Sequence, residues 1–217
     1  MEGMRLQALT LSLILFCASD RAQVAAPEPT EIEAEGEARA AAVASHLVGQ
    51  PAPAITLTTI EGKKIDLGEL YGQKPVYLKF WATWCVPCRQ QMSEFERIYE
   101  ALGDRIEVIA VNVGYADDEA AVRKYLTEID LKMPIAVDDG QLAGMLDLRV
   151  TPQHVLIELD GRIAYIGHLD GEPFHEALNA VLAGSSEGAT VAQHPAPASA
   201  STLQPGDSLG SLSVESI

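Results

Sequence analysis

The chain of 217 residues is long enough for one domain with a full hydrophobic core plus additional segments. Its formal net charge of −16 argues against nucleic-acid binding, because contacts to phosphate need clustered Lys and Arg. A hydrophobic content of 47% is that of an ordinary globular protein.

The N-terminus has the pattern of an export signal. Arg5 precedes an apolar run from Leu6 to Ala18, which is short for a membrane span but suits the apolar region of a secretory signal. We therefore predict a signal peptide or membrane anchor over residues 1–26. Two alternatives stay open: a lipoprotein with its lipid on Cys17, and an N-terminal helix of a cytosolic protein.

Three further parts follow this segment. Residues 27–47 are rich in Ala and Glu and predict a linker that is partly helical from Thr30 onward. Residues 48–184 carry the periodic apolar patterns of a folded domain. Residues 185–217 are rich in Ser, Ala, Gly and Pro without an apolar face, and predict a disordered low-complexity tail.

Within the domain, strand and helix patterns alternate. In chain order they predict a hairpin (Ile55–Thr58 with Lys64–Leu67), a strand (Val76–Trp81), a helix (Cys85–Leu102), a strand (Ile106–Val113), a helix capped by Asp117 and Asp118 and ending near Ile129, a short strand (Pro134–Val137), a short helix (Gln141–Leu146), two strands joined at Asp160-Gly161 (His154–Leu159, Arg162–Ile166) and a helix (Glu172–Leu182). This order predicts the α/β class, with a mixed central sheet flanked by helices.

The most informative motif is Cys85-Val86-Pro87-Cys88, which directly follows a predicted strand. A helix N-terminus favours the thiolate of the first cysteine, which attacks a disulfide before the second cysteine releases the product. A zinc site needs four ligands, and the only other cysteine is Cys17. The motif therefore predicts thiol–disulfide exchange; a structural disulfide and a pair of inert thiols are the alternatives.

Over about residues 48–183 the chain resembles exported thioredoxin-fold proteins of the TlpA/ResA-like (redoxin) family. The similarity is strongest in KFWATWCVPCRQQM, which begins at Lys79, and returns in Arg149-Val150-Thr151-Pro152. It implies a thioredoxin fold with an N-terminal β-hairpin and a short β-α insertion. It also implies site roles by position: Cys85 as nucleophile, Cys88 as resolving cysteine, Val86 and Pro87 setting the turn and redox poise, Trp84 beside the site, Pro152 as a cis-proline facing the pair, and Thr151 offering backbone groups to a substrate.

Three positions depart from this family pattern. Lys79 stands where many thioredoxins hold a buried acid; it either tunes the pKa of the cysteines or packs its stem and sends its charge to solvent. Gln91 stands where some relatives carry a functional glutamate, and it cannot titrate. Ser93 replaces a helix-kinking proline, which leaves the helix either straighter or bent by a serine back-bond.

The resemblance implies a thiol–disulfide oxidoreductase in the periplasm, or anchored through its N-terminus and facing it. Its partners would be protein thiols and disulfides, with electrons from a membrane donor and no cofactor or metal. Reduction of partners, as in cytochrome c maturation or general redox homeostasis, is the implied direction. One alternative is a thiol peroxidase; another is a copper-binding module using both thiolates and His154. We expect His168 and His175 at the surface.

Overall fold

The computed structural model describes residues 30–188, so the predicted signal or anchor over residues 1–26 and residues 189–217 of the predicted tail lie outside it. Residues 185–188 of that predicted tail are helical. The strands are β1 (Thr56–Thr58), β2 (Lys64–Asp66), β3 (Val76–Trp81), β4 (Glu107–Asn112), β5 (Ile135–Val137), β6 (Gln153–Ile157) and β7 (Ile163–Gly167). The helices are α1 (Glu31–Leu47), α2 (Leu67–Leu70), α3 (Val86–Gln90), α4 (Met92–Leu102), α5 (Glu119–Leu126), α6 (Gln141–Met145) and α7 (Glu172–Gly188). None of the helices within residues 30–188 is both long and apolar enough to cross a membrane.

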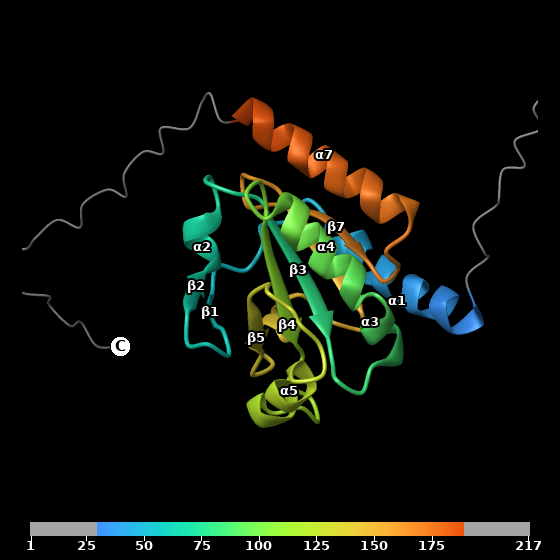
Figure 1. The fold of residues 1–217 in the computed structure, drawn as a ribbon. Coiled ribbons are helices and arrows are strands. Elements are labelled where there is room, and N and C mark those ends of the chain that lie inside the picture. The colour runs from blue at the N-terminus through green and yellow to red at the C-terminus, as the bar shows by residue number, and fades with distance from the viewer. Residues whose placement is uncertain (1–29, 189–217) are drawn as a thin grey trace, which may run out of the picture.

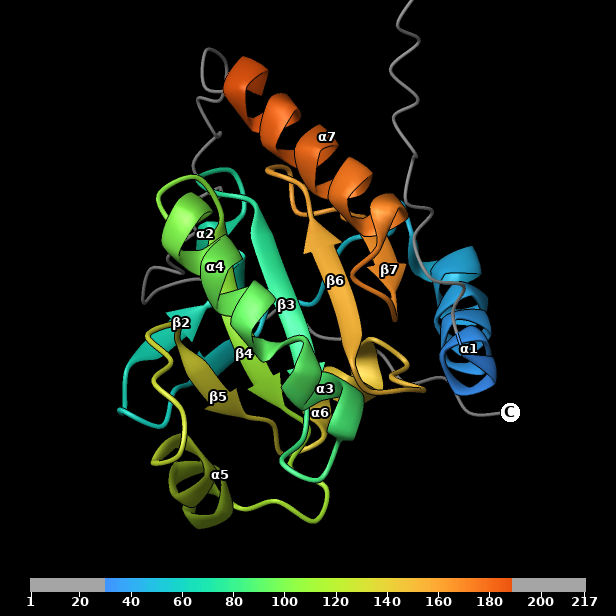
Figure 2. The same cartoon turned by 45° about the vertical axis from the view of Figure 1, so that its right-hand side comes forward.

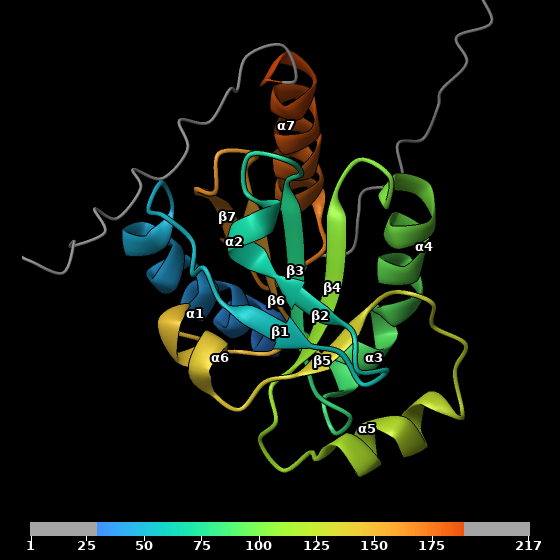
Figure 3. The same ribbon diagram turned by 90° about the vertical axis from the view of Figure 1, so that its left-hand side faces the viewer.

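The central sheet has the strand order β5-β4-β3-β6-β7, of which Figure 1 gives the overall setting and Figure 2 labels all five strands. Strand β3 pairs in parallel with β4 and antiparallel with β6, while β1 and β2 form a separate antiparallel hairpin. Helices α4 and α7 cover one face of the sheet (Figure 2), and α6 and the hairpin lie over the other (Figure 3). This arrangement confirms the predicted α/β class with a mixed sheet flanked by helices.

Strand β3 lies at the centre, and all six of its residues are buried. Because side chains alternate along a strand, Tyr77 and Trp81 join the core under α4 and α7, whereas Leu78 and Phe80 join the core on the opposite face. By the same alternation Lys79 lies on the face that carries α4. Strand β3 is therefore packed on both faces, and the cysteine motif follows shortly after its last residue.

Helix α1 confirms the helical structure predicted from Thr30 onward, but it packs against the domain, which the prediction of a linker over residues 27–47 does not include. Thr30 and Glu33 form a capping box at its start, and Gly36, Ala40 and Val43 are buried where the helix packs beside β7 (Figure 2). Small side chains on one face let the helix approach closely, but they make the sequence resemble an Ala/Glu spacer. Residues 31–47 are therefore part of the folded domain.

Two helix boundaries also differ from the sequence prediction. The single helix expected over residues 85–102 divides at Gln91, whose ψ of −6° is far from the helical value of about −42°. The Gln91 side chain accepts a hydrogen bond from Lys79, and the residue at the break is not a proline. Helix α7 continues past Gly184 to Gly188, and the Ser185 hydroxyl donates to the carbonyl oxygen of Leu182 in the preceding turn.

Candidate active site

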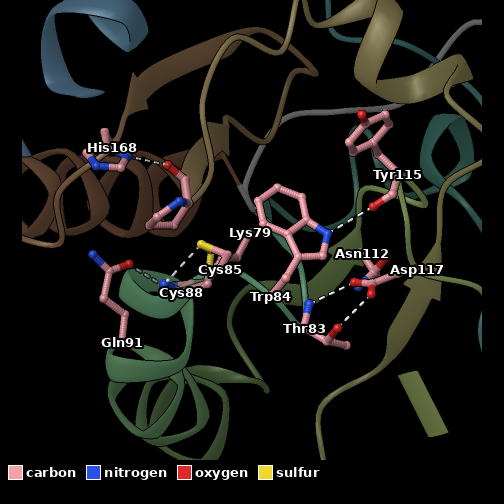
Figure 4. The surroundings of a disulfide bond; sticks show 11 residues. Lys79, Thr83, Trp84, Cys85, Cys88, Gln91, Asn112, Tyr115, Asp117 and His168 are labelled. Atoms are coloured by element: carbon pink, nitrogen blue, oxygen red, sulfur yellow. Dashed lines mark hydrogen bonds between the residues drawn. A yellow bond between two sulfur atoms is a disulfide. The ribbon is translucent and has the colours of Figure 1, made fainter. Parts of the chain in front are cut away.

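Cys85 and Cys88 are joined as a disulfide at the start of α3 (Figure 4). Cys85 is the N-cap residue of this helix, and its Sγ accepts a hydrogen bond of 3.2 Å from the backbone N–H of Cys88. Cys85 is 4% exposed and Cys88 is fully buried, so the small accessible part of the pair belongs to Cys85. After reduction, the same N–H stabilises a thiolate on Cys85. Cys85 is therefore suited to attack a disulfide, and Cys88 to attack the mixed disulfide that results.

The Thr151–Pro152 peptide bond is cis, as predicted. Gln153, the first residue of β6, pairs with Phe80 near the end of β3. Because Cys85 follows that end of β3, the cis-proline and the disulfide lie at the same end of the sheet. The backbone of Thr151 therefore lies at the end of the sheet that carries the disulfide.

Apolar side chains next to the disulfide are exposed. Trp84 is 50% exposed, and its Nε1 donates to the carbonyl oxygen of Tyr115 at 3.0 Å. Val86 and Tyr115 are also exposed. Beside them runs a groove of about 600 Å³, whose lining includes Trp84, Tyr115 and Thr151. An exposed apolar surface with a groove beside a redox disulfide suits a protein partner.

A hydrogen-bond network around Asp117 holds the loop before the disulfide. Its carboxylate accepts from the backbone N–H of Thr83 at 2.7 Å, from the Thr83 hydroxyl at 2.6 Å, and from the Asn112 amide at 2.8 Å (Figure 4). Burial raises the pKa of Asp117, but the bonds from Asn112 and Thr83 outweigh it, and the pKa lies below its ordinary value. Asp118 alone caps α5, through its bond with Ala121, so the predicted capping role of Asp117 is wrong.

Lys79 is buried beneath the cysteine helix. It is 1% exposed, and its Nζ donates to Oε1 of Gln91 at 2.7 Å. Within residues 30–188 its ammonium forms no ion pair. Burial lowers the pKa of Lys79 from 10.5 to about 7, against a smaller opposing effect of Asp170. The alternative in which the charge reaches solvent is therefore wrong.

His154 lies directly opposite Lys79 in the pairing of β6 with β3. Its Nδ1 is 2.6 Å from the Tyr77 hydroxyl, and its ring packs against Phe174. Burial lowers the pKa of His154 well below its usual value, and Lys79 adds to the effect, so the imidazole is neutral. His154 is therefore a buried residue with a local hydrogen bond.

His175 is exposed as expected, but His168 is buried, which contradicts the predicted surface position.

The AhpC/TSA family model matches residues 48–166, which is more than half of the chain. The chain belongs to the AhpC/TSA family. It is 35% identical over 137 residues to the thiol-disulfide oxidoreductase ResA of Bacillus cereus (strain ZK / E33L), covering 62% of this chain and 76% of ResA. It is 43% identical over 134 residues to the thioredoxin-like protein YneN of Bacillus subtilis (strain 168), covering 60% of this chain and 78% of YneN.

Among solved structures, the chain is similar to the pneumococcal exposed lipoprotein thioredoxin Etrx1 of Streptococcus pneumoniae strain TIGR4. The two share 28% identity and a TM-score of 0.53, over 59% of this chain and 97% of Etrx1. The fold is therefore the thioredoxin fold, with β1 and β2 as the N-terminal hairpin and β5 with α6 as the insertion. With its closed Cys85–Cys88 pair, this AhpC/TSA-family member is a thiol–disulfide oxidoreductase.

The structure brings most of the predicted site residues of this family member together. Trp84 and Thr151 line one groove, Val86 is exposed and Pro87 half-buried in the first turn of α3, and Lys79 lies below. Their roles toward a substrate stay predictions. The sequence did not reveal the hydrogen bonds that hold these residues in place. Asp117 accepts from the backbone N–H of Thr83, and the carbonyl oxygen of Tyr115 accepts from Trp84. His168 donates to the carbonyl oxygen of Pro152.

Proposed function

We propose that the protein reduces disulfides of partner proteins outside the cytoplasm, with Cys85 as nucleophile and Cys88 as resolving cysteine. The observation that carries this proposal is that Cys85 of the disulfide stands between the exposed residues Trp84 and Val86 in the chain, and that Trp84 lines the groove. A protein partner can rest on this surface while its own disulfide reaches Cys85. Trp84, Val86, Pro87, Thr151 and Pro152 are the proposed contact residues.

The reaction is a two-electron exchange. In the reduced protein the Cys85 thiolate attacks one sulfur of the partner disulfide, the partner's sulfur–sulfur bond breaks, and its other sulfur leaves as a thiolate. Cys88 then loses its proton and attacks Sγ of Cys85 in the mixed disulfide, which releases the second partner sulfur. The partner gains two electrons and, after protonation, two thiols. The Cys85–Cys88 disulfide that results must be reduced again by a dithiol donor.

Lys79 is the proposed tuning group for this second step. Its side chain is buried beneath α3, and its pKa of about 7 keeps a large fraction of the amine neutral near neutral pH. A neutral amine can accept a proton, which is the task that a buried acid performs at this position in many thioredoxins. The bond to Gln91, three residues after Cys88, supports a position of Nζ near the resolving cysteine.

The extracytoplasmic location rests on the predicted export segment over residues 1–26 and on the resemblance to exported relatives. Etrx1, a similar protein, is described as an exposed lipoprotein. In a periplasm the ambient conditions are oxidising, so a reductase there needs electrons from a membrane donor. We therefore propose such a donor as a partner, with the N-terminus as the point of membrane attachment where it is not cleaved.

The proposal is tested by comparing two oxidants of the reduced protein. We expect insulin disulfides to oxidise the Cys85–Cys88 pair faster than an equal concentration of hydrogen peroxide does. Thr83 supports this expectation, because its hydroxyl donates its hydrogen to Asp117 and does not offer it to a peroxide oxygen. The measurement is the loss of the Cys85 and Cys88 thiols themselves, followed by acid quenching, alkylation and mass measurement of the intact protein in single-turnover mixing, because insulin gains the two thiols that the protein loses. The Cys17→Ser variant is the control for the third cysteine. A faster reaction with peroxide would favour the thiol peroxidase.

A further inference from the structure

The N-terminal helix α1 is fastened to the loop after β7 by one carboxylate. A side-chain oxygen of Glu37 accepts from the backbone N–H of His168 at 2.9 Å and from that of Leu169 at 3.0 Å. Two backbone donors on one carboxylate oxygen fix the position of the helix relative to this loop. The contact joins residues more than a hundred positions apart, so it is a tertiary contact specific to this fold.

His168 connects this contact to the cis-proline. Its imidazole is buried, and its Nδ1 lies 2.7 Å from the carbonyl oxygen of Pro152 (Figure 4). A carbonyl oxygen only accepts, so Nδ1 carries the hydrogen and donates it. On its other side the ring packs against Gly36 so closely that a side chain there would overlap Cδ2 and Nε2 of His168. The ring is thus held between α1 and the cis-proline segment.

The same helix reaches the groove beside the disulfide. Arg39 lines this groove together with Trp84 and Thr151, and pairs with Glu35 one turn earlier on the exposed face of α1. Helix α1 therefore meets the site in two ways. It forms part of the groove wall through Arg39, and it holds the cis-proline segment through Glu37 and His168.

We propose that α1 is part of the binding site for partner polypeptides, with His168 as the positioning residue of the cis-proline segment and Arg39 as part of the groove wall. This inference rests on the proposed function. It names polypeptide disulfides as the substrate class that depends on α1. A small disulfide needs access to Cys85 alone, whereas a polypeptide also lies along the groove and the backbone of Thr151.

The test compares turnover of insulin, with dithiothreitol as the dithiol donor that reduces the Cys85–Cys88 pair again, with the single-turnover reduction of 5,5′-dithiobis(2-nitrobenzoic acid), a small disulfide, by pre-reduced protein. We expect His168→Leu to raise KM for insulin about tenfold, the effect of one lost buried hydrogen bond, with kcat and the rate with the small disulfide nearly unchanged. His168→Asn should recover most of the affinity, because its amide can donate to the Pro152 carbonyl. His175→Leu is the matched control, since His175 is an exposed histidine.

A second pair of variants avoids the buried interface. Arg39→Ala should raise KM for insulin about threefold, a change of well under 1 kcal/mol. Arg97→Ala, an exposed arginine that likewise pairs with a glutamate on its own helix, should leave it unchanged. This pair decides the matter if His168→Leu does not fold.

The outcomes separate the two proposals. A wild-type protein that reduces neither disulfide overturns the proposed function and this inference with it. A wild-type protein that reduces both, with folded His168→Leu or Arg39→Ala unchanged in KM for insulin, overturns only the role of α1. Equal slowing with insulin and with the small disulfide also overturns it, because the effect would then lie in the chemistry of Cys85.

Discussion

Replacement of Cys85 by serine is expected to lower the rate of disulfide reduction by at least about a thousandfold, because a serine hydroxyl stays protonated near neutral pH and cannot form a sulfur–sulfur bond. Of the two cysteines only Cys85 is accessible to solvent, and its sulfur accepts a hydrogen bond from the backbone N–H of Cys88. The residual activity of the variant measures what Cys88 can do alone. Since Cys88 is fully buried, we expect almost none.

Replacement of Cys88 by serine should give a different product. The attack by Cys85 still occurs, but nothing releases the partner, so a mixed disulfide accumulates. Non-reducing electrophoresis and intact mass measurement detect this adduct with a protein substrate. Both variants are made in the Cys17→Ser background, so that the third cysteine cannot resolve the adduct. An adduct through Cys88 in the Cys85→Ser variant, and none through Cys85, would contradict the assigned order.

Replacement of Lys79 by methionine is expected to stabilise the protein by about 2–4 kcal/mol near pH 6. Lys79 is buried without an ion pair among the described residues, and burial lowers its pKa from 10.5 to about 7. One pKa unit corresponds to about 1.4 kcal/mol, so a lowering of this size represents a penalty of about 4–5 kcal/mol at most. Methionine has a similar shape and no charge, but it loses the hydrogen bond to Gln91.

The pH dependence of the free energy of unfolding tests the effect of Lys79 more specifically than its value at one pH. Between about pH 7 and 10.5 the unfolded chain binds a proton on Lys79 that the folded protein does not, so the wild-type free energy of unfolding rises with pH in this window. Below pH 7 both states are protonated and the contribution stays constant. The advantage of Lys79→Met is therefore largest near pH 6 and shrinks toward about pH 10.

Urea unfolding of the oxidised proteins over this pH range makes the measurement, because cysteines in a disulfide do not titrate. Taking the difference between variant and wild type cancels the other titrating groups. Lys63→Met is the matched control, since Lys63 is exposed on the hairpin and its loss changes the net charge equally. A constant difference between Lys79→Met and wild type across the pH range would show that Lys79 keeps its ordinary pKa in the folded protein.

Local signals explain how much of the fold could be predicted from the sequence. The apolar run of β3 and the turn at Asp160-Gly161 depend on neighbouring residues only, and both elements lie close to where we expected them. The helical structure of α1 is predicted, but its packing against the sheet is not, because its buried residues include Gly36 and Ala40, which give no apolar periodicity. Its place in the domain depends on β7 and His168, contacts that a local pattern cannot contain.

The residues of the candidate site also fall into those with a local sequence motif and those held by long-range contacts. The cysteine pair and the cis-proline carry motifs of adjacent residues, so they were found. The residues that hold them were not found, because Asp117 lies 34 positions from Thr83 and His168 lies 16 positions from Pro152. Asp117 also resembles a helix cap beside Asp118, and that local interpretation concealed its bond to the active-site loop. Such support becomes visible only when the strands are assembled.

We propose that the Cys85–Cys88 pair reduces partner proteins, and its reduction potential tests this direction of electron transfer most directly. The full-length protein is equilibrated with dithiothreitol or glutathione buffers, and the fraction of disulfide is measured by thiol trapping and mass spectrometry. We expect a potential near or below about −250 mV, in the range of the low-potential thioredoxins. A potential between about −180 and −120 mV is that of a disulfide donor or isomerase, and would contradict the proposed direction.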